Sequence, residues 1–336
     1  MLKLKTCSKE LFSKEHKMEK IFLGNTGIEI SKVGFGVLTM GETQLNLAED
    51  EGSELISYAI TKGINLFDTA EYYNTYRYMA KAFKGKSDNL VISSKSMANT
   101  REWMMTAVDD ARKALDRDII EIFMLHEVRG LWELPFRRGA LEALLDLREK
   151  GIIKAVGIST HHIEVCEEVS RMSEVDIVFP LINFRGLGIR KGDGFGTAEE
   201  MAAAIAKCAK AGKGVLGMKA FGGGNLTGSY KKALDYVYGL RGIDAMMIGF
   251  GKKHEVDDIC TYLEGRMRSD YAPDVSKKRM HIDKGDCEGC GACVKRCTSK
   301  AISLNKETGQ AEINHSLCLT CGYCAPVCPE RAIIML

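Results

Sequence analysis

The chain has 336 residues, of which 45% are hydrophobic and 27% charged, and its formal net charge is +2. This composition is that of an ordinary globular protein with a large core, and only five prolines argue against extended disorder. The near-neutral charge argues against nucleic acid or an anionic membrane as a partner. A chain of this length predicts about two domains.

The amino-terminal segment lacks the apolar run of roughly 7–15 residues that a signal peptide needs. No stretch approaches the roughly 20 apolar residues of a membrane span. We therefore expect a cytoplasmic protein without a membrane partner. In that reducing compartment, clustered cysteines more often bind metal than form disulfides. Residues 1–17 match no regular element and are expected to form a loose arm.

Residues 18–264 alternate short apolar runs with amphipathic stretches. The runs resemble parallel strands buried on both faces, and each amphipathic stretch has the spacing of a helix; those at 100–115 and 197–212 follow a threonine cap. Repeated strand–helix units favour an α/β fold, a (β/α)₈ TIM barrel of about 250 residues. The expected strands are 30–38, 64–68, 90–95, 119–126, 153–159, 176–183, 214–220 and 245–251.

A doubly wound sheet is the alternative fold for this part of the chain. Its phosphate-binding fingerprint needs three spaced glycines between a strand and a helix. Gly34 and Gly36 supply the first two, but Thr39 takes the third position and no helical pattern follows at once. The barrel is therefore the prediction.

Eight of the 12 cysteines lie between Cys287 and Cys328, in two runs of C-x₂-C-x₂-C-x₃-C. This spacing is typical of bacterial ferredoxins with two 4Fe–4S clusters, in which the fourth cysteine of each run binds the other cluster. A pair of zinc sites is the alternative, but zinc sites usually separate two cysteine pairs by a longer stretch. One cluster would be held by Cys287, Cys290, Cys293 and Cys328, and the other by Cys318, Cys321, Cys324 and Cys297.

Residues 281–336 resemble a bacterial-type two-cluster ferredoxin throughout, which implies a small C-terminal α+β domain. The basic segment 265–280 contains Pro273 and is predicted to be a linker. The runs 300–305 and 331–336 follow the two cysteine runs as pseudo-repeats. Of the outlying cysteines, Cys166 and Cys208 fall on predicted helices and are expected to be small buried side chains.

Polar residues end the predicted barrel strands. In TIM barrels the active site lies at the carboxyl ends of the strands. A single polar residue there is often a helix cap or a buried core histidine, but seven strand ends that are polar or glycine favour a site. They are Asp68, Lys95, His126, Ser159, Asn183, Lys219 and Gly249, and Tyr73 follows in the loop after Asp68.

At these residues the chain resembles the aldo-keto reductase family. The resemblance implies a (β/α)₈ barrel that reduces a small-molecule carbonyl with NAD(P)H, and a catalytic tetrad of Asp68, Tyr73, Lys95 and His126. The matching segments are TGIEISKVGFG (26–36), FDTAEYYN (67–74), SSK (93–95), LH (125–126), GIS (157–159) and KAFGGG (219–224).

Carbonyl reduction suits these side chains. Hydride arriving at carbon leaves negative charge on oxygen, so the site needs a proton donor and an oxyanion stabiliser. A free tyrosine has a pKa near 10, and a neighbouring Lys95 cation is expected to lower the pKa of Tyr73. Asp68 would hold Lys95 as an ion pair, and His126 would orient or polarise the carbonyl. Tyr72 is the alternative phenol, but the family spacing favours Tyr73.

The resemblance also implies a nicotinamide site. Lys219 and the glycines 222–224 suit a pyrophosphate, and Lys252 and Lys253, after the last strand, suit a 2′-phosphate, which favours NADP(H). Lys252 and Lys253 also fit a solvated helix start. Glu255 and Ile259 stand where many members place a phosphate-binding Arg and an adenine-contacting Asn. The expected contacts are Ser159, Asn183, Met218, Lys219, Gly222, Gly223, Lys252 and Lys253.

Nicotinamides transfer two electrons as hydride, whereas 4Fe–4S clusters transfer one at a time. We therefore weigh three hypotheses. The first is an NADP(H)-dependent reductase of an aldehyde, ketone or quinone, whose ferredoxin domain transfers electrons, binds a redox protein or is structural. The second is an electron-transfer enzyme with a flavin or substrate at the barrel mouth. The third is a redox-sensing or partner-binding protein.

Overall fold

The computed structural model describes residues 18–86 and 89–336, so the expectation for residues 1–17 lies outside the described residues. Eight parallel strands close into a barrel, which confirms the predicted fold class. In spatial order they are β3 (Val33–Gly36), β4 (Leu66–Asp68), β5 (Val91–Ser96), β6 (Ile120–Leu125), β7 (Ile153–Thr160), β8 (Ile177–Pro180), β11 (Gly214–Met218) and β12 (Ala245–Gly249).

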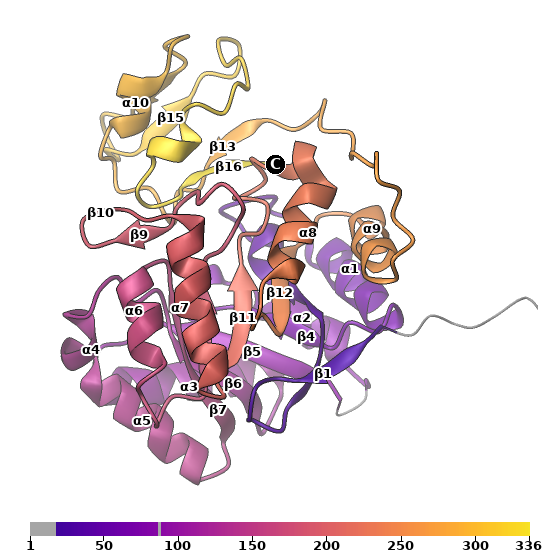
Figure 1. The fold of residues 1–336 in the computed structure, drawn as a ribbon, viewed down its shortest axis with the longest axis vertical. Coiled ribbons are helices and arrows are strands. Elements are labelled where there is room, and N and C mark those ends of the chain that lie inside the picture. Colours follow the sequence, from indigo (N-terminus) through magenta and orange to yellow (C-terminus); the bar gives the residue numbers. More distant parts are fainter. Residues whose placement is uncertain (1–17, 87–88) are drawn as a thin grey trace, which may run out of the picture.

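Helices cover the outside of the barrel (Figure 1). The hydroxyls of Thr100 and Thr197 cap α3 and α7 as the sequence predicts, accepting hydrogen bonds from the backbone N–H groups of Trp103 and Glu200. The barrel helices are α1 (Glu49–Thr61), α2 (Tyr76–Phe83), α3 (Arg101–Leu115), α4 (Glu133–Phe136), α5 (Arg138–Glu149), α6 (Ile163–Val169), α7 (Ala198–Lys210), α8 (Tyr230–Gly239) and α9 (Lys253–Leu263).

The first predicted strand is in fact two elements. β2 (Glu29–Ser31) pairs antiparallel with β1 (Lys20–Phe22), and only the following residues enter the barrel as β3. Sequence pattern does not separate them because the run is nearly continuously apolar. Ile30 packs in one apolar cluster with Leu66 and other barrel-interior residues. The hairpin of β1 and β2 thus covers the end of the barrel opposite the carboxyl ends of its strands (Figure 1).

Two predicted buried cysteines lie between adjacent helices. Cys166 on α6 and Cys208 on α7 are both fully buried, and their Sγ atoms are 3.9 Å apart. The Cys208 thiol also donates to the backbone carbonyl of Cys166 at 3.0 Å. They therefore pack as the small buried side chains that the sequence predicts.

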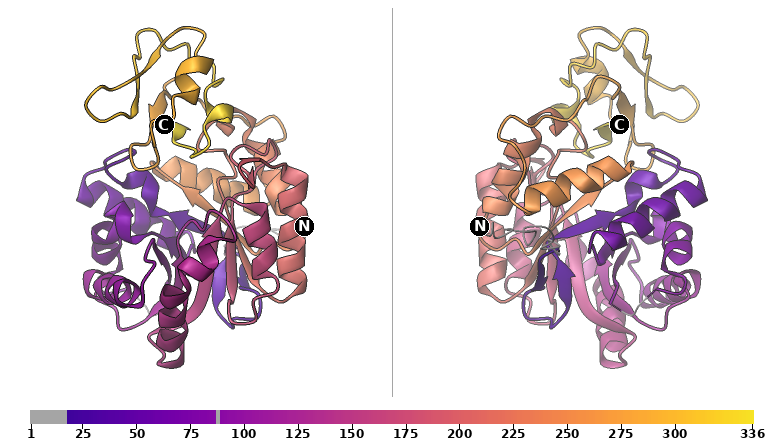
Figure 2. Two further views of the ribbon diagram at one scale, coloured as in Figure 1. Left: turned by 90° about the vertical axis from the view of Figure 1, so that its left-hand side faces the viewer. Right: turned by 90° about the vertical axis from the view of Figure 1, so that its right-hand side faces the viewer.

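The C-terminal domain lies over the carboxyl ends of the barrel strands (Figure 2). Residues 264–279 contain no helix or strand and lead into it, whereas Met280, the last residue of the predicted linker, begins β13. The pseudo-repeats of the sequence become β14 and β16. The elements of the C-terminal domain are β13 (Met280–Ile282), paired with β16 (Ile333–Met335), β14 (Ile302–Leu304), paired with β15 (Ala311–Ile313), and α10 (Ala292–Arg296). Below it, the barrel domain carries a separate two-stranded sheet of β9 (Arg190–Lys191) and β10 (Gly194–Phe195).

The loop after β11 holds the C-terminal domain. The backbone N–H of Met335 donates to the carbonyl of Gly223 at 2.8 Å, and the side chain of Asn225 donates to the carbonyl of Ile333 at 3.0 Å. Gly223 and Gly224 have φ of 65° and 82°, a left-handed backbone that favours glycine. The glycine run therefore has a structural role at the domain junction.

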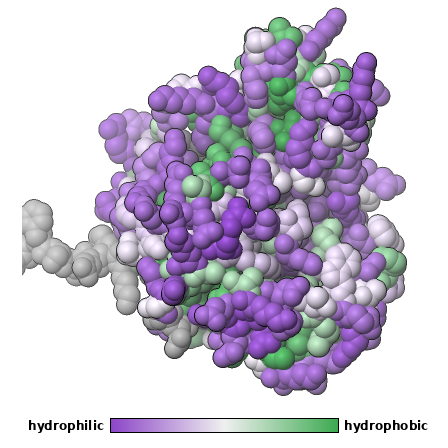
Figure 3. Space-filling view, turned by 180° about the vertical axis from the view of Figure 1, so that it is seen from behind, coloured by the Kyte–Doolittle hydropathy of each residue, from purple (hydrophilic) through white to green (hydrophobic). Residues whose placement is uncertain are grey.

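The rear surface is mostly hydrophilic, with apolar residues in small patches on the C-terminal domain and on the rest of the molecule below it (Figure 3). In the part of the chain that the structure describes, no helix has the length and apolar character needed to cross a membrane. The large apolar side chains exposed on this domain include Leu304, Leu317, Leu319 and Tyr323.

Candidate active site

A cavity of about 680 Å³ lies at the carboxyl end of the barrel, within the usual range of about 300–1,000 Å³ for ligand sites. Loops after the barrel strands form most of its wall. The linker adds Lys277 and Lys278, and the C-terminal domain adds Asp286 and Met335. Both domains therefore enclose one cavity.

Neighbouring strands β4 and β5 bring Asp68 and Lys95 together at its base. Lys95 Nζ lies 2.6 and 2.7 Å from the two carboxylate oxygens of Asp68 and 2.7 Å from the carbonyl of Thr69. Ser93 Oγ donates to the same carboxylate at 2.8 Å. Burial raises the pKa of Asp68 and lowers the pKa of Lys95, while their mutual attraction opposes both shifts. The pair is buried but fully hydrogen-bonded.

Tyr73 lies in the turn after β4, with its hydroxyl 3.2 Å from Nε2 of His126. Lys95 Nζ is 5.5 Å from the centre of the Tyr73 ring. Burial, followed by the charges of Tyr72 and Asp68, holds the pKa of Tyr73 well above its usual value. The expectation that Lys95 lowers this pKa is therefore wrong, because desolvation dominates and the ammonium is engaged by Asp68. Tyr73 remains a neutral phenol that carries a proton.

His126 is held as a neutral imidazole. Burial first, and then the positive charges of Lys95 and Arg137, keep its pKa well below the usual value. Tyr72 stacks on its ring with centroids 5.2 Å apart. His126 Nδ1 is buried and has no hydrogen-bond partner among the described residues. The ring can therefore orient a ligand by hydrogen bonding but adds no charge.

Part of the expected nucleotide site lines the cavity. Asn183 does not, because its amide donates to the carbonyl of Leu187 and accepts from the N–H groups of Arg185 and Leu187. Gly222 accepts from the C-terminal domain, and Lys253 pairs with Glu54 at 3.8 Å. The expected residues that do line the cavity are Ser159, Met218, Lys219, Gly223 and Lys252.

Several cavity residues were missed from sequence. Glu127 and His161 line the wall. The sequence could have indicated both, because Glu127 follows His126 and His161 lies two residues after Ser159. Asp286 had the weaker signal of preceding Cys287. Nothing in the sequence indicated that the linker lysines approach the barrel mouth, because their contacts depend on the path of the chain between domains.

A second, smaller cavity lies inside the C-terminal domain. Asp286 lines both cavities and so separates them. Burial and then the neighbouring charge of Cys328 raise the pKa of the Cys293 thiol. The second cavity is lined by the four cysteines expected to share one cluster, Cys287, Cys290, Cys293 and Cys328. Their convergence from both runs fits a thiolate-bound iron–sulfur cluster.

Two of the other cysteines, Cys318 and Cys321, lie near Cys324. Burial raises the pKa of its thiol to about 11, and the nearby charges of Cys321 and Cys318 contribute in the same direction. The backbone N–H of Ala301 donates to Cys297 Sγ at 3.2 Å, as backbone groups do to cluster sulfurs. Within residues 18–86 and 89–336, no group of three or more His, Cys, Asp or Glu side chains is arranged to hold a single metal ion.

Comparisons with known proteins agree with this architecture. The model of the aldo/keto reductase family matches residues 32–256, and that of the 4Fe-4S dicluster domain matches residues 286–332. A putative aldo-keto reductase from Pseudomonas aeruginosa superposes with a TM-score of 0.62 at 22% identity, covering 73% of this chain and 95% of that one. The holo form of an aldo-keto reductase from Bacillus halodurans gives a TM-score of 0.61 at 19% identity, covering 77% and 93%.

Curated relatives share part of the barrel. Aldo-keto reductase YhdN of Bacillus subtilis is 28% identical over 182 residues, 49% of this chain and 54% of its own. L-galactose dehydrogenase of Arabidopsis thaliana is 27% identical over 155 residues, 43% and 49%. The chain thus spans about half the length of these curated relatives. With the family model covering most of the barrel, this chain is an oxidoreductase that belongs to the aldo/keto reductase family and carries a C-terminal 4Fe-4S dicluster domain.

Proposed function

We propose that this protein reduces a carbonyl group of an aldehyde, ketone or quinone with NADP(H). The contact that carries the proposal is the 3.2 Å approach of the Tyr73 hydroxyl to His126 Nε2, beside the buried pair of Asp68 and Lys95. These four side chains end on one cavity large enough for a ligand. A neutral phenol, a neutral imidazole and a buried cation are the groups that a developing oxyanion needs.

The four side chains would divide the work. NADPH, when bound, would supply the hydride for the carbonyl carbon. Tyr73 donates its proton to the carbonyl oxygen, and His126 orients that oxygen through a hydrogen bond. Lys95 stabilises the negative charge that develops on oxygen and then on the phenol, and Asp68 keeps Lys95 in position. The high pKa of Tyr73 keeps the phenol protonated before the reaction.

Individual lysines on a cavity wall that also carries carboxylates such as Glu255 and Asp258 support a phosphate-bearing cofactor. Lys219 lies near the tetrad end, and Lys252, Lys277 and Lys278 line the part formed by the linker and the start of α9. We assign the nicotinamide carboxamide to Ser159, the face of the nicotinamide ring to Met218, the pyrophosphate to Lys219 and Gly223, and the 2′-phosphate to the linker end. Two of the relatives are a reductase and a dehydrogenase by name, which also favours nicotinamide chemistry.

The C-terminal cysteines would hold two 4Fe–4S clusters, which supply single electrons when bound. The convergence of four cysteines on one small cavity supports the crossed ligand set. The exposed apolar side chains of this domain suit a redox protein partner. We place the protein in the cytoplasm, where thiolate ligands stay reduced.

The test is NADPH oxidation by anaerobically purified protein with a simple aldehyde. We expect Tyr73→Phe to lower kcat by at least about a hundredfold, the scale of a general acid. Tyr236→Phe, a half-buried tyrosine on α8 away from the cavity, is the matched control. Full activity in the Tyr73 variant would refute the assigned acid, and loss in Tyr72→Phe alone would transfer the role to the neighbouring phenol.

A second candidate function is electron transfer to a flavin or substrate at the barrel mouth. It is favoured by Asp286, which lines both the barrel cavity and the cysteine cavity. Anaerobic NADPH titration with visible spectroscopy distinguishes the two. Bleaching of the iron–sulfur absorbance together with a flavin band supports this candidate, and binding of NADPH without bleaching supports carbonyl reduction alone.

A further inference from the structure

Glu127 is a cavity residue that hydride transfer does not use. It follows His126 with φ of 49°, a left-handed backbone that is uncommon for a residue other than glycine. Its backbone N–H donates to Ser159 Oγ at 2.7 Å, which holds this conformation. Strained backbone of this kind is found preferentially at functional sites. The strain turns a carboxyl group toward the same cavity as Tyr73.

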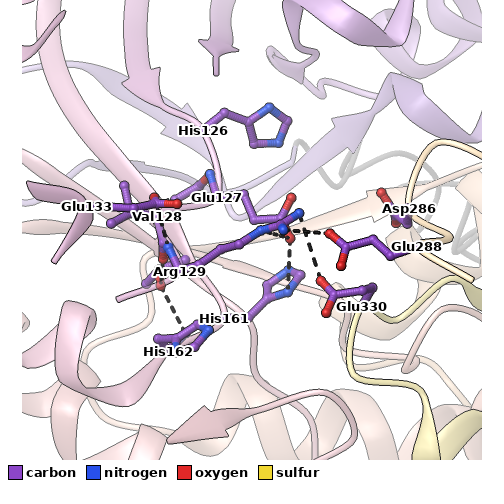
Figure 4. A network of polar contacts seen from close by, with 12 residues as sticks. His126, Glu127, Val128, Arg129, Glu133, His161, His162, Asp286, Glu288 and Glu330 are labelled. Carbon is purple, nitrogen blue, oxygen red and sulfur yellow. Dashed lines mark hydrogen bonds and ion pairs between the residues drawn. The ribbon is translucent and has the colours of Figure 1, made fainter. Parts of the chain in front are cut away.

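The carboxyl group lies at the more buried end of a polar network whose outer member, Glu288, is exposed (Figure 4). The ion-pair partner of Glu127 is Arg129, whose Nε lies 3.7 Å away, and Nδ1 of the neutral His161 lies at 3.9 Å; both distances exceed ordinary hydrogen-bond length. Burial is the main cause that raises the pKa of Glu127 to about 7, and Asp286 adds to it. The other facing charges are Arg129 and Lys219, which oppose the shift, and Glu330, which adds to it; burial keeps His161 neutral.

Arg129 shares its positive charge among three carboxylates, of which Glu127 is one. Its Nη1 donates to Glu288 at 2.8 Å, and its Nη2 lies 3.9 Å from Glu330. Both of these glutamates belong to the C-terminal domain and lie within two residues of Cys287 and Cys328. The arginine therefore forms its shortest ion pair across the domain junction, and Glu127 keeps the weaker share of its charge.

Proton counting gives this carboxyl group a role. Hydride reduction of a carbonyl needs one proton, and Tyr73 supplies it. A quinone that receives two electrons singly takes up two protons, because no hydrogen arrives with the electrons. We propose that Glu127 donates the second proton when a quinone-type acceptor in the barrel cavity is reduced by single electrons, while Tyr73 donates the first. This rests on the cluster assignment in the proposed function and is independent of NADP(H).

The overall step is balanced. The quinone, two electrons and two protons become a hydroquinone, with both carbonyl π bonds broken and two O–H bonds formed. Tyr73 loses its proton to one oxygen and Glu127 to the other, and both are reprotonated from solvent. A one-electron reductant is oxidised twice. Bound iron–sulfur clusters would pass single electrons to the quinone. A reduced electron-carrier protein is the class of reductant that would supply electrons to the clusters.

The protonation state of Glu127 is measured without substrate or nicotinamide. Infrared difference spectra report the C=O stretch of protonated carboxyl groups as pH is raised. We expect a component that disappears through about pH 7 and is absent in Glu127→Gln. Glu142→Gln, on the exposed face of α5, is the matched control and retains the component. An unchanged spectrum in Glu127→Gln would overturn the proposal.

The proton transfer is measured in a single turnover. Protein is reduced anaerobically, freed of excess reductant and mixed with a naphthoquinone, and the return of visible absorbance gives the rate. A haem protein too large for the cavity serves as comparison acceptor. The rate with the naphthoquinone divided by the rate with the haem protein therefore reports the step that takes place in the cavity. We expect this ratio to fall as pH rises through about 7, because the protonated carboxyl is the donor.

Glu127→Gln should lower the ratio roughly tenfold, a barrier increase of about 1.4 kcal/mol, and remove its pH step. Glu127→Asp, which keeps a titratable group, should restore a pH step. A ratio and pH profile in Glu127→Gln that equal those of the original protein would overturn the proposal. Failure of NADPH-dependent aldehyde reduction would leave both measurements unaffected, so the two proposals fail separately.

Discussion

The guanidinium of Arg331 donates through Nη2 to the carbonyl of Gly222 at 2.9 Å, and this contact joins the C-terminal domain to the barrel. Arg331 is 1% exposed, and its Nη1 donates to the carbonyl of Ala325 within its own domain at 3.1 Å. Burial lowers the pKa of Arg331 to about 10, and the charges of Cys328 and Asp286 oppose the shift. A buried charge hydrogen-bonded to backbone carbonyls of both domains is stable only while the domains stay packed around it.

Arg331→Met should therefore loosen the domain junction. It leaves two buried carbonyls without their donor, and each such group costs about 1–3 kcal/mol. We expect a lower melting temperature and faster protease cleavage within residues 264–279. Lys306→Met, on an exposed hairpin of the same domain, is the control. Equal cleavage rates for the two variants would show that Arg331 does not maintain the junction.

Gly224→Ala should disturb the same junction from the barrel side. Gly224 has φ of 82°, and a Cβ there would collide with the carbonyl oxygen of Met335. A left-handed backbone alone costs a non-glycine residue about 1–2 kcal/mol. Gly228→Ala is the control, since its Cβ would enter open space. Thermal unfolding should show a loss for the first and a change within about 0.5 kcal/mol for the second; equal melting temperatures would contradict this.

Lys95→Met should be strongly destabilising. It removes the only cation bonded to the buried carboxylate of Asp68 in the described structure, and breaking a buried pair typically costs about 3–5 kcal/mol. Lys113→Met breaks the exposed pair with Asp109 on α3 and should leave the free energy of unfolding unchanged. Denaturant unfolding measures both. A small effect at Lys95 would mean that Asp68 takes up a proton at little cost.

Glu127→Gln should stabilise the protein at higher pH. The pKa of this carboxyl is raised from 4.5 to about 7 on folding, so the folded state binds the extra proton between these values. The stabilisation that this bound proton gives the folded state is complete below about pH 4.5 and is lost as pH rises through 7. The glutamine variant has no such loss, and its advantage should grow to about 3 kcal/mol above pH 7. Urea unfolding across this pH range tests it; a difference independent of pH would refute the shift.

Much of the fold could be predicted from local pattern. Near-continuous apolar runs mark strands buried on both faces, and threonines such as Thr100 and Thr197 mark helix starts. Asp68, Lys95 and His126 lie at or beside strand ends and Tyr73 follows in the turn after β4, and the parallel direction of the strands places these ends together. Pattern failed at Ile30, where an apolar run continues through a hairpin into the barrel, because apolarity does not report which strand is the partner.

The sequence by itself determined the barrel, the cysteine-rich domain and the residue types that meet at the strand ends, because periodicity and spacing are local properties. Only the tertiary structure decided which charges are desolvated and which segments from distant parts of the chain share a wall. Burial, not Lys95, sets the pKa of Tyr73. Packing between domains brings Asp286 and the linker lysines to the barrel cavity and gives Glu127 a proton near neutral pH, since solvent exclusion depends on every element around a group.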